Sequence, residues 1–225
     1  MKFDSPLALA SLIDHTLLRP EATLEDIRRL CQEAKHYGFH AVCVNPVYVA
    51  SAREWLEGSG VRVAAVVGFP LGANTTPVKV VEAMEAVQNG AQELEVVLPV
   101  GLLRSRRLDL VRVDLKNVIA LTPQAVHKVI LETGLLSPEE VALACRMAVE
   151  AGAQFVKTST GFGPAGATVE DVRRIREAVG DRVRIKAAGG IRNLEDLMAL
   201  VEAGADRIGT RSGVAIMEEY LAALS

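Results

Sequence analysis

The sequence lacks the features that mark secreted, membrane-spanning or nucleic-acid-binding proteins. Its three cysteines, Cys31, Cys43 and Cys145, are odd in number and lack metal-ligand spacing, which indicates reduced thiols in a cytoplasm. No apolar run approaches the ~18 residues that cross a bilayer, and the start of the chain, with Asp4 and Asp14, does not resemble a signal peptide. The net charge of −3 argues against a nucleic-acid-binding surface. We therefore expect a cytoplasmic protein with no membrane and no nucleic-acid partner.

The chain also lacks a linker. No segment rich in proline, glycine or serine divides its 225 residues, half of which are hydrophobic. This length would permit two small domains, but a closed α/β barrel commonly has this size as one unit. We expect residues 1–225 to form a single domain.

One unit recurs along the chain: an amphipathic helical stretch, a glycine and then a short apolar run. The glycines fit left-handed helix caps that precede strands. The expected strands are Leu12–Thr16, Ala41–Val44, Val61–Val67, Glu93–Leu98, Ala125–Leu131, Phe155–Lys157, Arg182–Ala187 and Arg207–Thr210. Strands that alternate with helices through short connections pair in parallel, so the pattern predicts an α/β protein with a single (β/α)₈ TIM barrel.

Two lysines are notable because each ends an apolar, strand-like run that is followed by glycine. Lys157 and Lys186 would carry costly desolvated charges there unless they were paired or gave up a proton. One interpretation is that Lys157 attacks a carbonyl to form a Schiff base, which requires a neutral amine and is favoured by burial and a nearby cation such as Lys186. The alternative is a lysine whose stem packs while its head reaches solvent, binds phosphate or forms a salt bridge.

Alternate strand residues face the interior of such a barrel, and its chemistry takes place at the carboxyl ends of the strands. This alternation would bring four cations and three carboxylates together, where they persist only if paired and hydrogen-bonded. The expected group is Lys128, Lys157, Lys186, Arg184, Asp14, Glu93 and Glu95. We further expect Glu93 and Arg184 to pair in a lower interior layer.

Glycine-rich segments after the last two expected strands indicate an anion site. Segments 189–192 and 209–213 occupy the positions where such barrels bind phosphate through backbone N–H groups, and Arg211 could add a charge-assisted contact. Two ordinary tight turns are the alternative. Segment 161–166 is either a mobile loop that closes over substrate or a plain connection to a helix capped near Thr168.

Five motifs, in the same order along the chain, resemble the deoxyribose-phosphate aldolase family. They are Ile13–Leu18, Val67–Gly72, Lys128–Gly134, Phe155–Gly161 and Lys186–Arg192. The resemblance spans nearly the whole chain. It implies a class I aldolase on a (β/α)₈ barrel that reversibly cleaves 2-deoxy-D-ribose 5-phosphate to glyceraldehyde 3-phosphate and acetaldehyde, in deoxyribose phosphate catabolism. It also implies a homodimer with small-molecule partners, a sugar phosphate and an aldehyde, and no cofactor or metal.

The resemblance assigns catalytic roles position by position. Lys157 would form the imine, Lys186 would favour its neutral form and assist proton transfer, and Asp14 and Lys128 would support this network. The family has an aspartate where this chain has Glu95, and the extra methylene moves the carboxylate by about 1 Å, a shift that can cost rate. A backbone shift could accommodate it. Two alternatives follow: a Schiff-base aldolase with another donor or acceptor, or a sugar-phosphate-binding protein with impaired turnover that Glu95→Asp would restore.

The resemblance also assigns substrate contacts. The positions are Thr16, Cys43, Thr160, Gly161, Gly189, Gly190, Thr210, Arg211 and Ser212. Arg211 stands where a small serine is common in the family, so it would either tighten phosphate binding or crowd it. Cys43 resembles an aldehyde-reactive cysteine of the family, although a small buried hydrophobic residue is the alternative. The four histidines share no metal-ligand spacing, and we expect no metal site.

Overall fold

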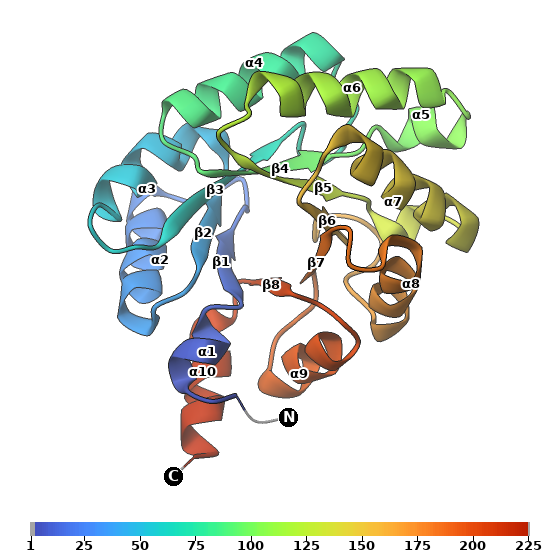
Figure 1. The fold of residues 1–225 in the computed structure, drawn as a ribbon. Helices are drawn as coiled ribbons and strands as arrows, with labels where there is room; N and C mark the ends of the chain where they lie inside the picture. Colours follow the sequence, from blue (N-terminus) through green and yellow to red (C-terminus); the bar gives the residue numbers. More distant parts are fainter. Residues whose placement is uncertain (1–2, 225) are drawn as a thin grey trace.

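A computed structural model, which describes residues 3–224, shows a closed barrel of eight parallel strands surrounded by helices (Figure 1). The strands are β1 (Ile13–Leu17), β2 (Ala41–Val44), β3 (Arg62–Val67), β4 (Glu93–Val97), β5 (Val126–Ile130), β6 (Phe155–Lys157), β7 (Arg184–Ala188) and β8 (Arg207–Thr210). Each strand pairs with the next along the chain, and β8 pairs with β1 to close the ring. The predicted (β/α)₈ barrel is therefore confirmed, with strand ends within two residues of those expected.

Helices cover the outside of the barrel. They are α1 (Pro6–Ala10), α2 (Leu24–Tyr37), α3 (Val49–Trp55), α4 (Thr76–Gln88), α5 (Val100–Arg104), α6 (Leu108–Leu121), α7 (Pro138–Ala151), α8 (Val169–Val179), α9 (Leu194–Glu202) and α10 (Gly213–Ala222), with short 3₁₀ turns at Pro46–Tyr48 and Thr133–Leu135. The expected glycine caps are present: Gly38 and Gly152 end α2 and α7 in the left-handed conformation, with φ of 73° and 93°. None of the helices in residues 3–224 is long and apolar enough to cross a membrane.

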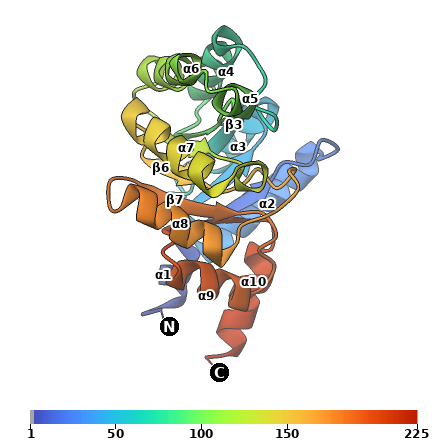
Figure 2. The same cartoon turned by 90° about the vertical axis from the view of Figure 1, so that its right-hand side faces the viewer.

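The ends of the described chain meet where β1 joins β8. Helices α1 and α10 pack against each other there (Figure 1), and Figure 2 shows both, together with α9, at one end of the molecule. The Tyr220 hydroxyl donates a hydrogen bond to the Phe3 carbonyl at 3.1 Å, and the two rings meet edge to face. This contact ties the first and last helices together next to the closing strand pair.

The two faces of each strand differ in what they bury. On β3, Val63 and Ala65 belong to the large apolar core between the barrel and its helices, whereas Ala64 and Val66 face the interior in a small separate cluster. Most of the apolar core thus lies outside the barrel, between strands and helices. Besides this small cluster, the interior holds buried charged side chains, which form the site described below.

A buried ion pair fixes α4 to α6 outside the barrel. The Lys79 ammonium, which is inaccessible to solvent, donates to Asp114 at 2.7 Å and to the Val97 carbonyl at 2.9 Å. Burial lowers the pKa of Lys79 although Asp114 opposes the shift. Because removing one partner leaves an uncompensated buried charge, we expect Lys79→Ala to lower the free energy of unfolding by about 3–5 kcal/mol. Urea denaturation measures this value, and Lys116→Ala, on the exposed face of α6, should change it by no more than about 0.5 kcal/mol.

Candidate active site

The carboxyl half of the barrel interior holds three lysines around one carboxylate. Glu95 on β4 accepts from Lys157 of β6 at 2.6 Å through Oε2, and from Lys186 of β7 at 2.5 Å through Oε1. Lys128 of β5 approaches the same Oε1 at 3.2 Å. All four side chains are buried. Gly209 on β8 makes room for them, since a Cβ there would lie 2.7 Å from Cε of Lys186.

Asp14 on β1 closes the network from the opposite side. Its Oδ2 accepts from Lys186 at 2.5 Å and from Lys128 at 2.6 Å. Its Oδ1 accepts from Arg207 of β8 at 3.0 Å. The five residues to which we assigned catalytic roles, Asp14, Glu95, Lys128, Lys157 and Lys186, are therefore brought together, and Arg207 joins them.

The fourth cation of the interior is not the one expected from the sequence. Arg184 is exposed, and its guanidinium lies 4.1 Å from the centre of the Phe155 ring. Because β7 begins at Arg184, this side chain lies at the amino-terminal opening of the barrel, while Arg207 is buried. Alternation places Arg207 on the same face as Gly209, but it places Arg184 on the inward face as well, so it does not decide which of the two is buried.

The expected pair between Glu93 and Arg184 is also wrong. Glu93 lies 2.6 Å from Lys128 and 3.2 Å from Arg62, and it contacts His40 at 3.0 Å. Burial alone would raise the pKa of Glu93, but His40 and Lys128 outweigh it and lower the pKa to about 2. The partners of Glu93 therefore come from β5, β3, the residue before β2 and, at 4.0 Å, Arg207 of β8, rather than from β7.

The network fixes most of its own charges. Burial alone would raise the pKa of the Glu95 carboxyl, but the neighbouring lysines outweigh it and hold that pKa well below the usual value. The same balance holds the pKa of Asp14 well below its usual value. Burial disfavours the charged amine of Lys186, yet Asp14 and Glu95 outweigh it and raise the pKa of Lys186. A cation that shares Glu95 with Lys157 is the neighbour that the Schiff-base interpretation requires.

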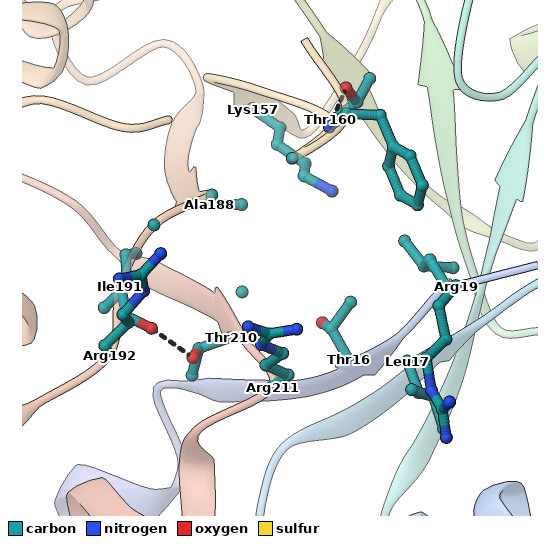
Figure 3. A pocket seen from close by; sticks show the side chains of 16 residues that line it. Thr16, Leu17, Arg19, Lys157, Thr160, Ala188, Ile191, Arg192, Thr210 and Arg211 are labelled. Atoms are coloured by element: carbon teal, nitrogen blue, oxygen red, sulfur yellow. Dashed lines mark hydrogen bonds between the residues drawn. The ribbon is translucent and has the colours of Figure 1, made fainter. Parts of the chain in front are cut away.

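A pocket of about 430 Å³ opens beside Lys157 at the carboxyl ends of the strands (Figure 3). Lys157 extends into it from one wall and Arg211 from the opposite wall. Of the residues expected from the sequence, the pocket is lined by Thr16, Lys157, Thr160, Gly161, Gly189, Gly190, Thr210 and Arg211. Its lining also includes Arg19, Phe162 and Arg192, to which we had assigned no individual role. Arg19 directly follows the motif Ile13–Leu18, whereas Phe162 and Arg192 lie within segments 161–166 and 189–192, and these positions were the available signal.

The glycine-rich turns form one end of this pocket. Gly189 and Gly190 have φ of 91° and 80°, the region that favours glycine. The Thr210 hydroxyl donates to the Ile191 carbonyl at 2.7 Å and accepts from the Ser212 N–H at 2.9 Å, which joins the β7 and β8 turns. Ser212 is the N-cap of α10 and does not line the pocket. Backbone turns, a helix N-terminus and Arg211 therefore converge at this end.

Cys43 lies away from the pocket lining. Its side chain is inaccessible and packs with Leu18, Ala64 and Val66. Burial raises the pKa of the Cys43 thiol to about 12, so the reactive thiolate is scarce at neutral pH. This surrounding favours the interpretation of Cys43 as a small buried hydrophobic residue.

Within residues 3–224, one group of side chains has the spacing of metal ligands. Ligand atoms of Asp14, His40 and Glu93 lie within 4.8 Å of one another. Both carboxylates are already bound by Lys128, at 2.6 Å each. A lysine ammonium between two potential ligands repels a cation, so this group does not fit a metal ion.

The comparisons with known proteins agree with this geometry. Residues 8–219 match the model of the DeoC/LacD family aldolases. The chain is 52% identical over 222 residues to the deoxyribose-phosphate aldolase of Caldanaerobacter subterraneus subsp. tengcongensis, covering 97% of this chain and 96% of that protein. It is 54% identical over 214 residues to that of Thermococcus gammatolerans, covering 93% and 95%. The structure of the tetrameric deoxyribose phosphate aldolase from Aeropyrum pernix superposes with a TM-score of 0.92 at 39% identity, covering 98% of this chain and 94% of that one. The chain belongs to the DeoC/LacD family of aldolases.

Proposed function

We propose that the protein is a class I deoxyribose-phosphate aldolase that reversibly cleaves 2-deoxy-D-ribose 5-phosphate to D-glyceraldehyde 3-phosphate and acetaldehyde. The observation that carries this proposal is the lysine at the pocket floor. Lys157 reaches the pocket, while its amine shares the Glu95 carboxylate with Lys186. Sequence relatives named for this activity support the choice of substrate.

The first step is imine formation. The neutral amine of Lys157 attacks the open-chain aldehyde, and loss of water gives a protonated imine. Glu95 Oε2, 2.6 Å from Nζ, is placed to accept the proton that the amine must lose. Lys186 donates to Oε1 of the same carboxylate at 2.5 Å and so places a second cationic group beside the Lys157 amine, an arrangement used by Schiff-base lysines.

The second step is cleavage between C2 and C3. The iminium accepts the bonding electrons, the C3 hydroxyl loses its proton, and glyceraldehyde 3-phosphate leaves. The resulting enamine is then protonated, and hydrolysis of the imine releases acetaldehyde and Lys157. Glu95 accepts the C3 hydroxyl proton through water, and that proton returns by way of Lys186 to the enamine carbon. Because the pKa of Glu95 is held well below its usual value, Glu95 gives the proton up again readily. Asp14 and Lys128 hold the relay in place.

The phosphate group would bind at the end of the pocket formed by the turns after β7 and β8. At Gly189 and Gly190 no side chain hinders the approach of a ligand to the backbone, and α10 begins at Gly213 immediately behind these glycines. Arg211 and Arg192 line the same end, and neither guanidinium forms an ion pair within residues 3–224. Two guanidinium groups that are free to bind a ligand, beside backbone N–H donors, suit a dianionic phosphate.

Arg211 offers a test of the phosphate site. We expect Arg211→Ser to raise KM for deoxyribose 5-phosphate about tenfold, because a hydrogen bond between charged groups is lost, and to leave kcat nearly unchanged. Steady-state kinetics measure both constants. Arg28→Ser, an exposed arginine of α2 outside the pocket, is the matched control. A lower KM in Arg211→Ser would mean that Arg211 crowds the phosphate.

The function itself is tested by trapping. The protein is incubated with deoxyribose 5-phosphate, reduced with borohydride and digested, and the added mass is located by peptide mass spectrometry while acetaldehyde is assayed. We expect an adduct on Lys157 together with acetaldehyde release. An adduct without acetaldehyde would mean that the imine forms but the proton relay fails. The absence of any adduct would exclude a Schiff base with this substrate.

The proposal includes a cytoplasmic homodimer in which residues 1–225 form one domain. Exposed apolar side chains on the neighbouring helices α4 and α6 support a self-association surface, among them Val78, Val81 and Val113. Light scattering at defined protein concentration measures the assembly.

A further inference from the structure

Glu132 is a buried carboxylate to which the mechanism above gives no role. It follows β5, only 4% of it is exposed, and its backbone is left-handed, with φ 57° and ψ 62°. This conformation is unfavourable for a residue with a side chain, and such residues persist where the surrounding structure holds them, often at functional sites. The contacts of Glu132 show what holds it here.

Both carboxylate oxygens of Glu132 bind one residue of the next strand connection. Oε1 accepts from the Thr160 N–H at 3.2 Å, and Oε2 accepts a short hydrogen bond from the Thr160 hydroxyl. That hydroxyl in turn accepts from the Phe162 N–H at 3.0 Å. Gly163 packs on the same carboxyl, since a Cβ there would lie 2.7 Å from Cδ of Glu132. Glu132 therefore fixes the beginning of the β6–α8 loop, residues 160–167.

The other end of this loop touches the expected phosphate site. The Ala167 N–H donates to the Gly189 carbonyl at 3.0 Å. A Cβ on Gly166 would lie 2.3 Å from the same carbonyl oxygen, so the loop backbone is pressed against the turn after β7. Between the two ends, Phe162 meets Phe69 edge to face with ring centres 5.4 Å apart and forms part of the pocket wall.

The position of the Lys157 side chain does not depend on this loop. Lys157 lies within β6, which is paired with β5 and β7, and its amine is held by Glu95. Loss of the Glu132 carboxylate would free residues 160–167 without removing any contact of the nucleophile. Phosphate binding and imine formation should therefore respond differently to the same substitution.

We propose that Glu132 is a positioning residue that sets the affinity for the phosphate group, because it holds the β6–α8 loop against the Gly189–Gly190 turn. The inference rests on the proposed function for the identity of the substrate. Its contacts also explain why segment 161–166, for which a mobile loop and a plain connection were both open, is tied at its two ends in this structure. Thr168 caps α8, as expected.

Two substitutions separate the carboxylate from the backbone conformation. Glu132→Gln keeps the size of the side chain and one acceptor oxygen, whereas Glu132→Gly removes the side chain and tolerates the left-handed backbone. We expect Glu132→Gly to raise the Kd for inorganic phosphate, measured by calorimetry, about tenfold, and Glu132→Gln to raise it less, since hydrogen bonds to a charged acceptor are lost or weakened. Borohydride trapping of acetaldehyde on Lys157 should proceed at the wild-type rate in both.

Kinetics give the second readout. The ratio of kcat/KM for deoxyribose 5-phosphate to that for unphosphorylated deoxyribose should fall about tenfold in Glu132→Gly, in parallel with the phosphate affinity. Thr133→Val is the neighbouring control, since it removes the Thr133–Asp171 hydrogen bond without touching Thr160. In a double-mutant cycle, Glu132→Gln and Thr160→Val should be non-additive.

The outcomes distinguish the inference from the proposed function. An unchanged phosphate Kd in both Glu132 variants would overturn the positioning role. An equal loss of kcat/KM with deoxyribose 5-phosphate and with unphosphorylated deoxyribose would overturn it as well. A wild-type protein that binds phosphate but cleaves neither sugar would reject the proposed function, while the phosphate Kd would still decide on Glu132. If Glu132→Gly melts well below the wild type, Glu132→Gln carries the test.

Discussion

Replacing Lys157 with methionine is expected to abolish cleavage of deoxyribose 5-phosphate. Methionine keeps a long unbranched stem in the buried position but supplies no amine, so the imine cannot form. Removal of a nucleophile typically costs about 10⁴-fold or more in rate, because the whole covalent route is lost. Acetaldehyde release measures turnover, and borohydride trapping measures the imine. Both signals should disappear together, while thermal denaturation shows that the barrel is still folded.

The control for this experiment is a lysine outside the site. Lys116→Met, on the exposed face of α6, should retain wild-type activity. Lys186→Met provides the sharper comparison, because Lys186 contacts the same Glu95 carboxylate but does not line the pocket. An adduct that remained on Lys186 in the Lys157→Met protein would show that the two lysines had been assigned the wrong roles.

The barrel could be predicted because the sequence repeats one unit of helix, glycine and strand, and each copy of the unit can be recognised from its own residues. Two of the amphipathic helices, α2 and α7, end at Gly38 and Gly152, which adopt the left-handed cap that the pattern indicates. The alternation of strand residues predicted that Lys157, Lys186 and Glu95 share the interior, as they do, whereas their catalytic roles came from the resemblance to the family. The first and last residues of each strand are harder to predict than the strand itself, because they are set by hydrogen bonds to the neighbouring strands.

Properties that depend on position along the barrel axis could not be predicted in this way. Arg184 and Arg207 both begin their strands, and both belong to the inward face, yet only Arg207 is buried. Which of the two reaches Asp14 depends on the stagger between β7 and β8, where Lys186 pairs with Arg207. Strand stagger is a property of the closed sheet rather than of any segment.

The contact between Glu132 and Thr160 shows a second limit. The sequence of the β5 motif contains no glycine at position 132, so nothing in it indicates a left-handed backbone there. That conformation is stabilised by a partner from the next strand connection, 28 residues away. Likewise, Arg19 reaches the pocket only because the turn after β1 lies beside the turn after β8. Such residues are found from tertiary contacts, not from periodicity.

Replacing Glu95 with aspartate is expected to lower kcat about a hundredfold, the cost of displacing a catalytic group by about 1 Å. The longer glutamate of this chain already reaches its partners, at 2.6 Å from Lys157 and 2.5 Å from Lys186. A shorter side chain on the same backbone would withdraw the carboxylate from both amines. Borohydride should still trap an adduct on Lys157, but more slowly, because the amine remains while its proton acceptor recedes.

The alternative hypothesis, in which Glu95 impairs turnover, predicts the opposite change in kcat. If Glu95 impaired turnover, the aspartate found in the family would restore it, and kcat would rise in Glu95→Asp. The matched control is Glu93→Asp, the same change two residues earlier on the same face of β4, where the carboxylate contacts Lys128 and Arg62 instead of Lys157. We expect that variant to lose far less activity. A fall in kcat confined to Glu95→Asp would mean that the barrel has adjusted its lysines to the longer carboxylate.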